Sequence, residues 1–228
     1  MSVQALVSGL SLDDTLAWRP EGPVSVRAYL GDAQCVARSL PQGDWVLNMC
    51  EDRYHFAVVF AACLITGRTS LQPASHSVET LDRLAHAYPG AYCVSDGDFG
   101  SPGLTRIKYA HLSKGLRMPV LEIPDIDADR VAAILFTSGS TGLPQPHGKT
   151  WGQLVMNGRA EAQALGLAGT GTALVGTVPV QHSYGFESTF LLALHGGGSF
   201  WSGKPFYPQD VVDALHAVPR PRMLVTTP

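Results

Sequence analysis

The stretch from residue 131 to 142 constrains the fold of this chain more than any other. It begins with six apolar residues, 131–136 (VAAILF), which are enough for a buried strand and too few for a typical helix. The next six residues, TSGSTG, carry four hydroxyls and two glycines. Glycine lets the backbone approach a ligand closely, and successive N–H groups with hydroxyl donors suit phosphate oxygens. Because an ordinary polar turn needs fewer such residues, we predict a polyphosphate site made by Thr137, Ser138, Gly139, Ser140, Thr141 and Gly142.

Two other motifs with glycines and hydroxyls do not fit this stretch. A Walker A loop has four residues between its glycines, whereas five separate Gly142 from Gly148, and two of those five are prolines without an N–H. The Gly-x-Ser-x-Gly elbow of serine hydrolases needs glycines on both sides of the serine, and neither Ser138 nor Ser140 has them. The spacing therefore excludes a P-loop NTPase and a serine hydrolase of that type.

Residues 136–144 (FTSGSTGLP) resemble the phosphate loop of the adenylate-forming superfamily, which includes acyl-CoA synthetases, aryl-acid ligases and the adenylation domains of peptide synthetases. Nine consecutive positions match the signature aromatic-Thr-Ser-Gly-(Ser/Thr)-Thr-Gly-x-Pro. Gln145 and Pro146 then stand where the family usually carries Lys and Gly, and Lys149 is our candidate for a replacement cation at the phosphates. The form SGSTGxPxPHxKTW is most similar to stand-alone ligases associated with bacterial aryl-polyene and xanthomonadin-type pigment pathways.

A second motif, residues 179–185 (PVQHSYG), resembles the family pattern Pro-x-x-His-x-(Tyr/Phe)-Gly. A lone loop histidine is more often structural, but His182 follows a predicted parallel strand, where open α/β sheets commonly place ligands. The resemblance implies that His182, Tyr184 and Gly185 line the substrate site and that His182 donates a hydrogen bond to the developing acyl phosphate. The other seven histidines share no metal-ligand spacing, and we expect no metal ligands in this chain.

Strand and helix patterns alternate along the chain, which predicts an α/β fold of largely parallel sheets flanked by helices. The predicted strands are 45–50, 69–71, 91–95, 107–109, 120–123, 131–136, 172–178, 199–201 and 223–226. The predicted helices are 25–40, 54–65, 77–88, 150–165, 186–194 and 210–217, with Thr150 and Gln153 as a capping box. We expect a short helix and a loop in residues 1–24, and an acidic linker with a change of structural layer near 124–130.

Composition limits the partners. The net charge of −3 and the absence of a Lys/Arg cluster give no electrostatic case for nucleic acid. The longest apolar run, 56–65, is too short to span a bilayer, and the N-terminus lacks a signal-peptide pattern. Four cysteines without a C-x-x-C pair predict buried reduced thiols. We therefore expect a cytoplasmic protein with no membrane span.

The resemblance also implies an activity. A carboxylic acid, with an aryl acid preferred, would be activated with ATP and Mg²⁺ as an acyl-adenylate and passed to the thiol of CoA or an acyl-carrier protein. Family enzymes are about twice as long, so we expect 1–228 to be the incomplete N-terminal core, without the C-terminal half and mobile lid domain, and inactive alone. One alternative is a non-catalytic binding or assembly module derived from a ligase, which Gln145 favours. The other is an unrelated α/β nucleotide binder, against which the nine matches and the second motif argue.

Overall fold

The structure, a computed structural model, describes residues 2–73, 75–98, 103–138 and 144–227. Its strands are β1 (Val3–Ala5), β2 (Thr15–Arg19), β3 (Gly22–Ser25), β4 (Trp45–Asn48), β5 (Thr69–Gln72), β6 (Tyr92–Ser95), β7 (Thr105–Lys108), β8 (Asp125–Asp127), β9 (Val131–Ser138), β10 (Pro144–Thr150), β11 (Ala173–Gly176), β12 (Ser199–Trp201) and β13 (Arg222–Val225). Its helices are α1 (Val26–Ser39), α2 (Arg53–Thr66), α3 (Val78–Ala87), α4 (Tyr109–Leu112), α5 (Trp151–Ala164), α6 (Ser183–Gly185), the π-helix η1 (Phe186–Leu191), α7 (Leu192–Gly196) and α8 (Pro208–Ala217).

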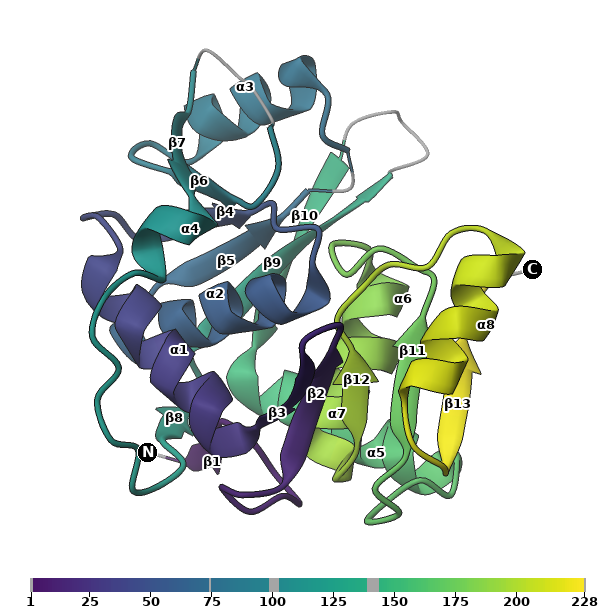
Figure 1. The fold of residues 1–228 in the computed structure, drawn as a ribbon. Helices are drawn as coiled ribbons and strands as arrows, with labels where there is room; N and C mark the ends of the chain where they lie inside the picture. The colour runs from purple at the N-terminus through teal and green to yellow at the C-terminus, as the bar shows by residue number, and fades with distance from the viewer. Residues whose placement is uncertain (1, 74, 99–102, 139–143, 228) are drawn as a thin grey trace.

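These strands form two main sheets (Figure 1). The first has six strands in the order β10-β9-β5-β4-β6-β7, and the second has five in the order β13-β11-β12-β2-β3. Pairing is parallel throughout both sheets except for the antiparallel pairs β9–β10 and β2–β3 at one edge of each. The predicted α/β fold with largely parallel sheets is confirmed.

Helices cover both faces of both sheets, as the side-chain alternation of the strands requires. In β4, Val46 joins the central core with α1, α2, α5 and η1, whereas Leu47 faces the outer core under α3. In β11, Leu174 faces the central core, and Val175 faces a third core under α8. Figure 1 shows α2 near the middle of the molecule, α3 at the top and α8, in yellow, at the right. The two sheets therefore share one central helical layer.

Helix α2 is the most deeply buried element of that layer. Of its first twelve residues, Arg53 to Leu64, all except His55 are buried. Asp52 caps its start by accepting a hydrogen bond from the amide of His55, and Gly67 ends it in the left-handed conformation at φ 78°. An all-round apolar helix is stable only when it is enclosed on every side, which explains its place between the sheets.

The predicted short helix and loop in residues 1–24 are wrong. Residues 15–25 form the hairpin β2–β3, and β2 pairs in parallel with β12, more than 180 residues later in the chain. Leu6 and Leu16 are fully buried in the central core. Their apolar side chains therefore reflect burial and not the spacing of a helix. The strand conformation is imposed by a distant partner that local sequence does not reveal.

Two predictions in the irregular middle of the chain also need correction. Residues 120–123 form no strand, and the carbonyl of Val120 accepts a hydrogen bond from Arg27 Nη1 at 2.6 Å instead of a ladder bond. The acidic stretch predicted as a linker contains β8, which pairs antiparallel with β1. In both cases the pairing partner, or its lack, decided the backbone conformation.

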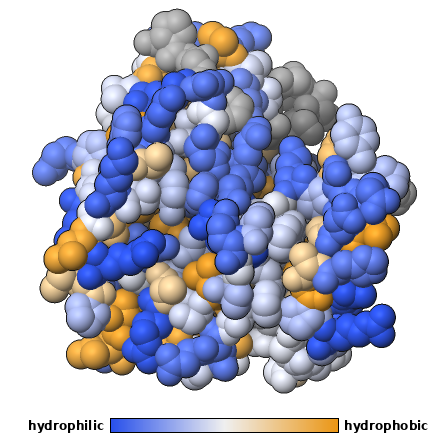
Figure 2. Space-filling view, in the orientation of Figure 1, coloured by the Kyte–Doolittle hydropathy of each residue, from blue (hydrophilic) through white to orange (hydrophobic). Residues whose placement is uncertain are grey.

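The surface is mainly hydrophilic on the face drawn in Figure 2, with hydrophobic residues in small scattered groups. Within the described ranges, no helix combines the length and the apolar character needed to cross a bilayer. All four cysteines are free and buried, as predicted.

Candidate functional site

A cleft of about 360 Å³ opens where the carboxyl ends of the two sheets meet. Its lining comes from four separate connections: Glu51 after β4; Pro73 and His76 after β5; Pro179, Gln181 and His182 after β11; and Lys204 after β12. The volume falls in the range of small-molecule sites, and the position is where parallel sheets usually bind ligands. The cleft is the candidate functional site.

The predicted phosphate loop starts from the same edge of the first sheet. β9 runs parallel to β5, with Leu135 opposite Gln72, so the end of β9 lies on the same side as the residues that follow β5. Thr137 and Ser138 form the last residues of β9, where they pair with Gln145 and Pro144 of β10. Gly139, Ser140, Thr141 and Gly142 lie outside the described residues. The end of β9 at Ser138 and the start of β10 at Pro144 therefore lie at the carboxyl edge that carries the cleft.

Lys149 lies at the other end of this hairpin. It pairs with Ala133, five residues along β10 from Pro144. At about 3.3 Å per residue the backbone separation is roughly 17 Å, which is beyond the reach of a lysine side chain. Lys149 and Pro144 therefore lie at opposite ends of β10. Lys149 precedes α5, whose capping box of Thr150 and Gln153 forms as predicted.

The turn that carries His182 is held by short backbone contacts. The amide of His182 donates to the carbonyl of Pro179 at 3.1 Å, and its carbonyl accepts from the amide of Phe186 at 2.8 Å. A Cβ on Gly185 would lie 2.2 Å from the carbonyl oxygen of Pro179, so only glycine fits there. His182 is exposed and lines the cleft, whereas Gly185 is buried beneath the turn and Tyr184, 40% exposed, is not part of the lining.

Gln181 connects this turn to the first sheet. Its side chain is buried, and Nε2 donates a hydrogen bond to the backbone carbonyl of Cys50, just after β4. Directly after the turn, the chain enters the π-helix η1, a rare conformation that is frequent at functional sites. The backbone around His182 is therefore fixed on both sides of the cleft.

Three further ionisable groups surround the cleft. Glu51 and Lys204 are exposed residues of its lining, and the charges of both act on His76, which also lines the cleft. Burial lowers the pKa of His76, Glu51 opposes this shift, and Lys204 adds to it. With His182, the lining offers two imidazoles and one ammonium as hydrogen-bond donors, and one carboxylate that accepts.

The wall of the cleft is built on the residues that start α2, which we call the head of α2 (residues 51–55). Arg53 is 2% exposed and reaches the second sheet. Its Nη1 donates to the carbonyls of Trp201 and Gly203 at 2.9 Å each, and its Nη2 donates to those of Gly176 and Val178 at 3.2 and 3.1 Å. Burial lowers the pKa of Arg53 to about 10, so it remains charged at neutral pH. One guanidinium thus donates hydrogen bonds to the carboxyl ends of both β11 and β12.

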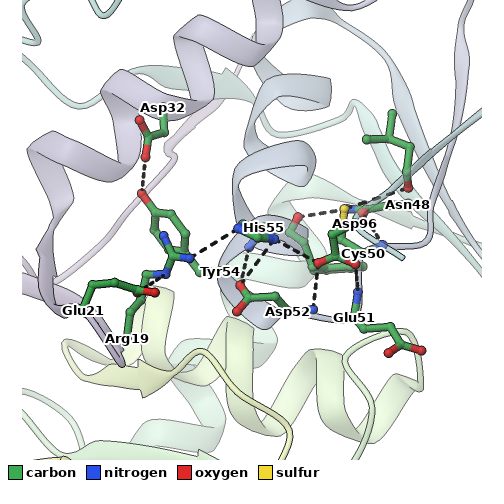
Figure 3. Close-up of polar contacts among 12 residues, drawn as sticks. Arg19, Glu21, Asp32, Asn48, Cys50, Glu51, Asp52, Tyr54, His55 and Asp96 are labelled. Atoms are coloured by element: carbon green, nitrogen blue, oxygen red, sulfur yellow. Dashed lines mark hydrogen bonds and ion pairs between the residues drawn. The ribbon is translucent and has the colours of Figure 1, made fainter. Parts of the chain in front are cut away.

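The opposite side of the head of α2 is tied to the first sheet (Figure 3). Asp96, after β6, accepts hydrogen bonds from the amides of Glu51 at 2.8 Å and Asp52 at 3.0 Å, and contacts His55 Nδ1 at 2.9 Å. His55 Nε2 lies 3.4 Å from Arg19 Nη2 of β2, and its ring stacks on Tyr109 with centroids 4.1 Å apart. Asp96 therefore fixes the turn from which Glu51 enters the cleft.

Sequence reasoning missed Arg53, His55 and Asp96. A partial signal existed: residues 51–53 are Glu-Asp-Arg, placed between a buried strand and an almost wholly apolar helix, where polar residues need partners. Their partners come from β2, β6, β11 and β12, which are distant in sequence. A metal centre is not supported: among the described residues no group of three or more His, Cys, Asp or Glu is arranged to hold an ion.

Residues 45–228 match a protein family described as AMP-binding enzyme. A 4-coumarate–CoA ligase of Halorhodospira halophila is 46% identical over 50 residues, which are 22% of this chain and 12% of that protein.

Solved structures share the fold at low identity. An o-succinylbenzoate CoA synthetase (MenE) double mutant from Bacillus subtilis, bound to the product analogue OSB-NCoA, superposes with a TM-score of 0.79 at 18% identity, covering 94% of this chain and 47% of that one. ATP-bound MatB from Rhodopseudomonas palustris gives 0.74 at 21%, covering 90% and 46%. MenE with ATP and magnesium gives 0.73 at 18%, covering 91% and 58%. The chain spans about half the length of the structures it matches.

Proposed function

The chain belongs to the AMP-binding enzyme family, and from this premise we propose that its protein activates a carboxylic acid with ATP as an acyl-adenylate and transfers the acyl group to a thiol. The observation that supports the proposal is the common sheet edge: β9 ends with Thr137 and Ser138 at the edge where His182 lines a cleft between the two sheets. Within the protein, residues 1–228 would form part of an N-terminal domain, and we assign the protein to the cytoplasm.

In the proposed first step, a carboxylate oxygen of the acid attacks the α-phosphorus of ATP. The bond from that phosphorus to the bridging oxygen breaks, and pyrophosphate leaves. The N–H groups and hydroxyls of residues 137–142 would stabilise the negative charge that builds on the leaving phosphates. The imidazole of His182 would donate a hydrogen bond to the acyl phosphate, and the ammonium of Lys204 at the same cleft would add positive potential.

In the second step a thiolate attacks the acyl carbon, and AMP leaves with the electrons of the acyl–oxygen bond. CoA or an acyl-carrier protein would supply the thiol. The family resemblance favours Mg²⁺ as a counter-ion of ATP, but the described residues include no cluster that would hold it; we assign it no ligand and no step. The substrate we favour is an aryl acid, which rests on the similarity of residues 138–151 to pigment-pathway ligases.

A second candidate function is a non-catalytic nucleotide-binding or assembly module. It is favoured by Gln145, which pairs with Thr137 at the position where the family usually has a lysine. It is also favoured by the separation of Lys149 from Pro144, because Lys149 is the only lysine or arginine of β10 and lies at the opposite end of that strand. Both functions use the same phosphate turn; they differ in chemistry.

The phosphate turn can be tested on this chain with pyrophosphate as the probe, using calorimetry and ³¹P NMR. We expect the double variant S140A/T141A to weaken pyrophosphate binding about tenfold or more, because it removes two hydroxyl donors to an anion. The matched control S113A/T105A removes two hydroxyls elsewhere and should leave binding unchanged. Equal affinity in the wild type and S140A/T141A, or no binding at about 10 mM, would contradict the proposed role of the turn.

A further inference from the structure

A second cavity, of about 320 Å³, lies on the outer face of the six-stranded sheet, between α3 and the β9–β10 hairpin. Leu81 and Leu84 of α3 pack on β4, β5 and β6. Between α3 and the β9–β10 hairpin the sheet is not fully covered, and this leaves the cavity. The two elements lie at the same end of the molecule in Figure 1. The residues that line it include Thr80, Arg83, Leu84, Tyr88, Phe136 and Pro146. It shares no lining residue with the cleft at His182.

One wall of this cavity is aromatic and well supported. The rings of Tyr88 and Phe136 meet edge to face, with centroids 6.1 Å apart and an interplanar angle of 84°. Trp45 packs on Tyr88 from behind, with centroids 5.1 Å apart. Pro146 lies opposite Phe136 in the β9–β10 register and extends the apolar surface across the hairpin. Both Tyr88 and Phe136 are only half-buried, so part of each ring is available to a ligand.

The other side of the cavity carries a cation. Arg83 projects from α3 and donates one hydrogen bond from Nη2 to Glu79 Oε1 at 2.6 Å. The two side chains are 47% and 79% exposed, so this is a weak surface pair. A guanidinium has five N–H donors in a fork that suits a carboxylate, and the pair with Glu79 uses one of them. The cavity thus combines flat aromatic rings with a carboxylate-binding group at its edge.

We propose that this cavity binds a small planar aromatic carboxylate, with its ring against Tyr88 and Phe136 and its carboxylate on Arg83. The volume is at the lower end of ligand sites and suits a ligand of one ring. Phe136 directly precedes Thr137 in β9, so a ligand held here contacts the base of the phosphate hairpin from the face opposite the central core. The site does not depend on the proposed ligase activity.

The test is a titration of this chain with 4-hydroxybenzoate, followed by calorimetry and by ¹⁵N NMR of the amides of Arg83, Tyr88 and Gln145. We expect R83Q to weaken binding about tenfold, because a charge-assisted hydrogen bond is lost. E79Q should tighten binding about twofold to threefold, because it frees the guanidinium from its surface partner. The uncharged 4-hydroxybenzamide and the non-aromatic cyclohexanecarboxylate should each bind at least fivefold more weakly. K114Q serves as a control for general loss of positive charge.

H182A separates this site from the cleft, and it should leave binding of 4-hydroxybenzoate to the cavity unchanged. If H182A abolished binding while R83Q and E79Q had no effect, the acid would bind in the cleft and the proposed cavity site would be wrong. Equal binding of the amide, or no binding at about 10 mM, would also overturn it. None of these outcomes bears on pyrophosphate binding at the phosphate turn.

Discussion

The side chain of Arg53 links the central helical layer to the second sheet. It sits at the start of an apolar helix of the central layer, yet its four donated hydrogen bonds all go to carbonyls at or just beyond the ends of β11 and β12 in the second sheet. Two of these carbonyls belong to the buried residues Gly176 and Val178, where the guanidinium supplies their side-chain donor. The side chain therefore acts as a cap on two strand ends at once.

We predict that R53M destabilises the chain by about 3 kcal/mol, since it leaves several buried carbonyls without donors. R53K should cost less, because it keeps the charge but not the fork that spans two strands. Urea unfolding followed by circular dichroism measures both. R83M, which removes an exposed arginine, is the matched control and should change the free energy of unfolding by less than about 0.5 kcal/mol. A loss of similar size in R53M and R83M would refute the role assigned to Arg53.

Asp96 makes the free energy of unfolding depend on pH. Burial by itself would raise its pKa, but hydrogen bonds from His55 and from the amides of Glu51 and Asp52 outweigh burial and hold the pKa below the ordinary value of 3.8. A carboxyl whose pKa is depressed on folding stabilises the protein above its unfolded pKa of about 3.9, and this contribution is lost as the pH falls through the folded pKa.

The variant D96N should therefore be less stable than the wild type by about 2 kcal/mol near neutral pH, and the difference should shrink below about pH 4. Urea midpoints at about pH 7, 5 and 3 give the comparison. D98N, at an exposed carboxylate after the same strand that makes surface ion pairs with Arg106 and Lys108, controls for loss of negative charge. A stability gap between D96N and the wild type that stayed constant with pH would contradict the assignment.

At the scale of elements, the connection from β11 to the π-helix places His182. It is a tight turn closed by backbone hydrogen bonds, and Gly185 is the position at which it touches the carbonyl of Pro179. The sequence motif containing His182 is thus partly a packing motif: the glycine is needed for the turn, and the turn presents the imidazole to the cleft.

G185A should lower the thermal midpoint by several degrees, corresponding to about 2 kcal/mol of overpacking. It should also shift the ring resonances of His182 in NMR spectra. G148A is the matched control, because a Cβ there would meet its nearest neighbour, Val131, at 3.8 Å, an ordinary contact. If G185A and G148A have the same thermal midpoint and the His182 resonances do not move in G185A, the turn tolerates a side chain at 185 and the role assigned to Gly185 is wrong.

Sequence patterns located most elements because each pattern records a local requirement. Ser77 caps α3 and Thr150 caps α5 as predicted, and Gly67 ends α2 in the conformation that only glycine adopts easily. The patterns failed where a strand depends on a partner. β2 and β8 are short strands whose pairing residues lie far away in the chain, and residues 120–123 look like a strand but have no partner strand.

For the molecule as a whole, the two sheets and their shared helical layer bring four connections into one cleft. We predict that residues 1–228 alone produce no measurable acid-dependent exchange of labelled pyrophosphate into ATP, while still binding pyrophosphate. The reason is that Gln145 pairs with Thr137 at the position where the family usually has a lysine, so β10 brings no lysine to the end of β9. Robust exchange with an added aryl acid would refute this, and Q145K tests whether restoring the charge strengthens pyrophosphate binding.

The sequence by itself determined the strand before the phosphate turn, the His182 motif and the α/β alternation, because these depend on neighbouring residues and on the periodicity of burial. Only the tertiary structure decided that Lys149 pairs with Ala133 at the end of β10 away from Pro144, that Arg53 joins the central helical layer to the second sheet, and that Asp96 holds the residues before α2. Each of these depends on strand register or on contacts between segments distant in the chain. Local sequence shows that a residue is buried or charged; only the register and the packing of the sheets select its partner.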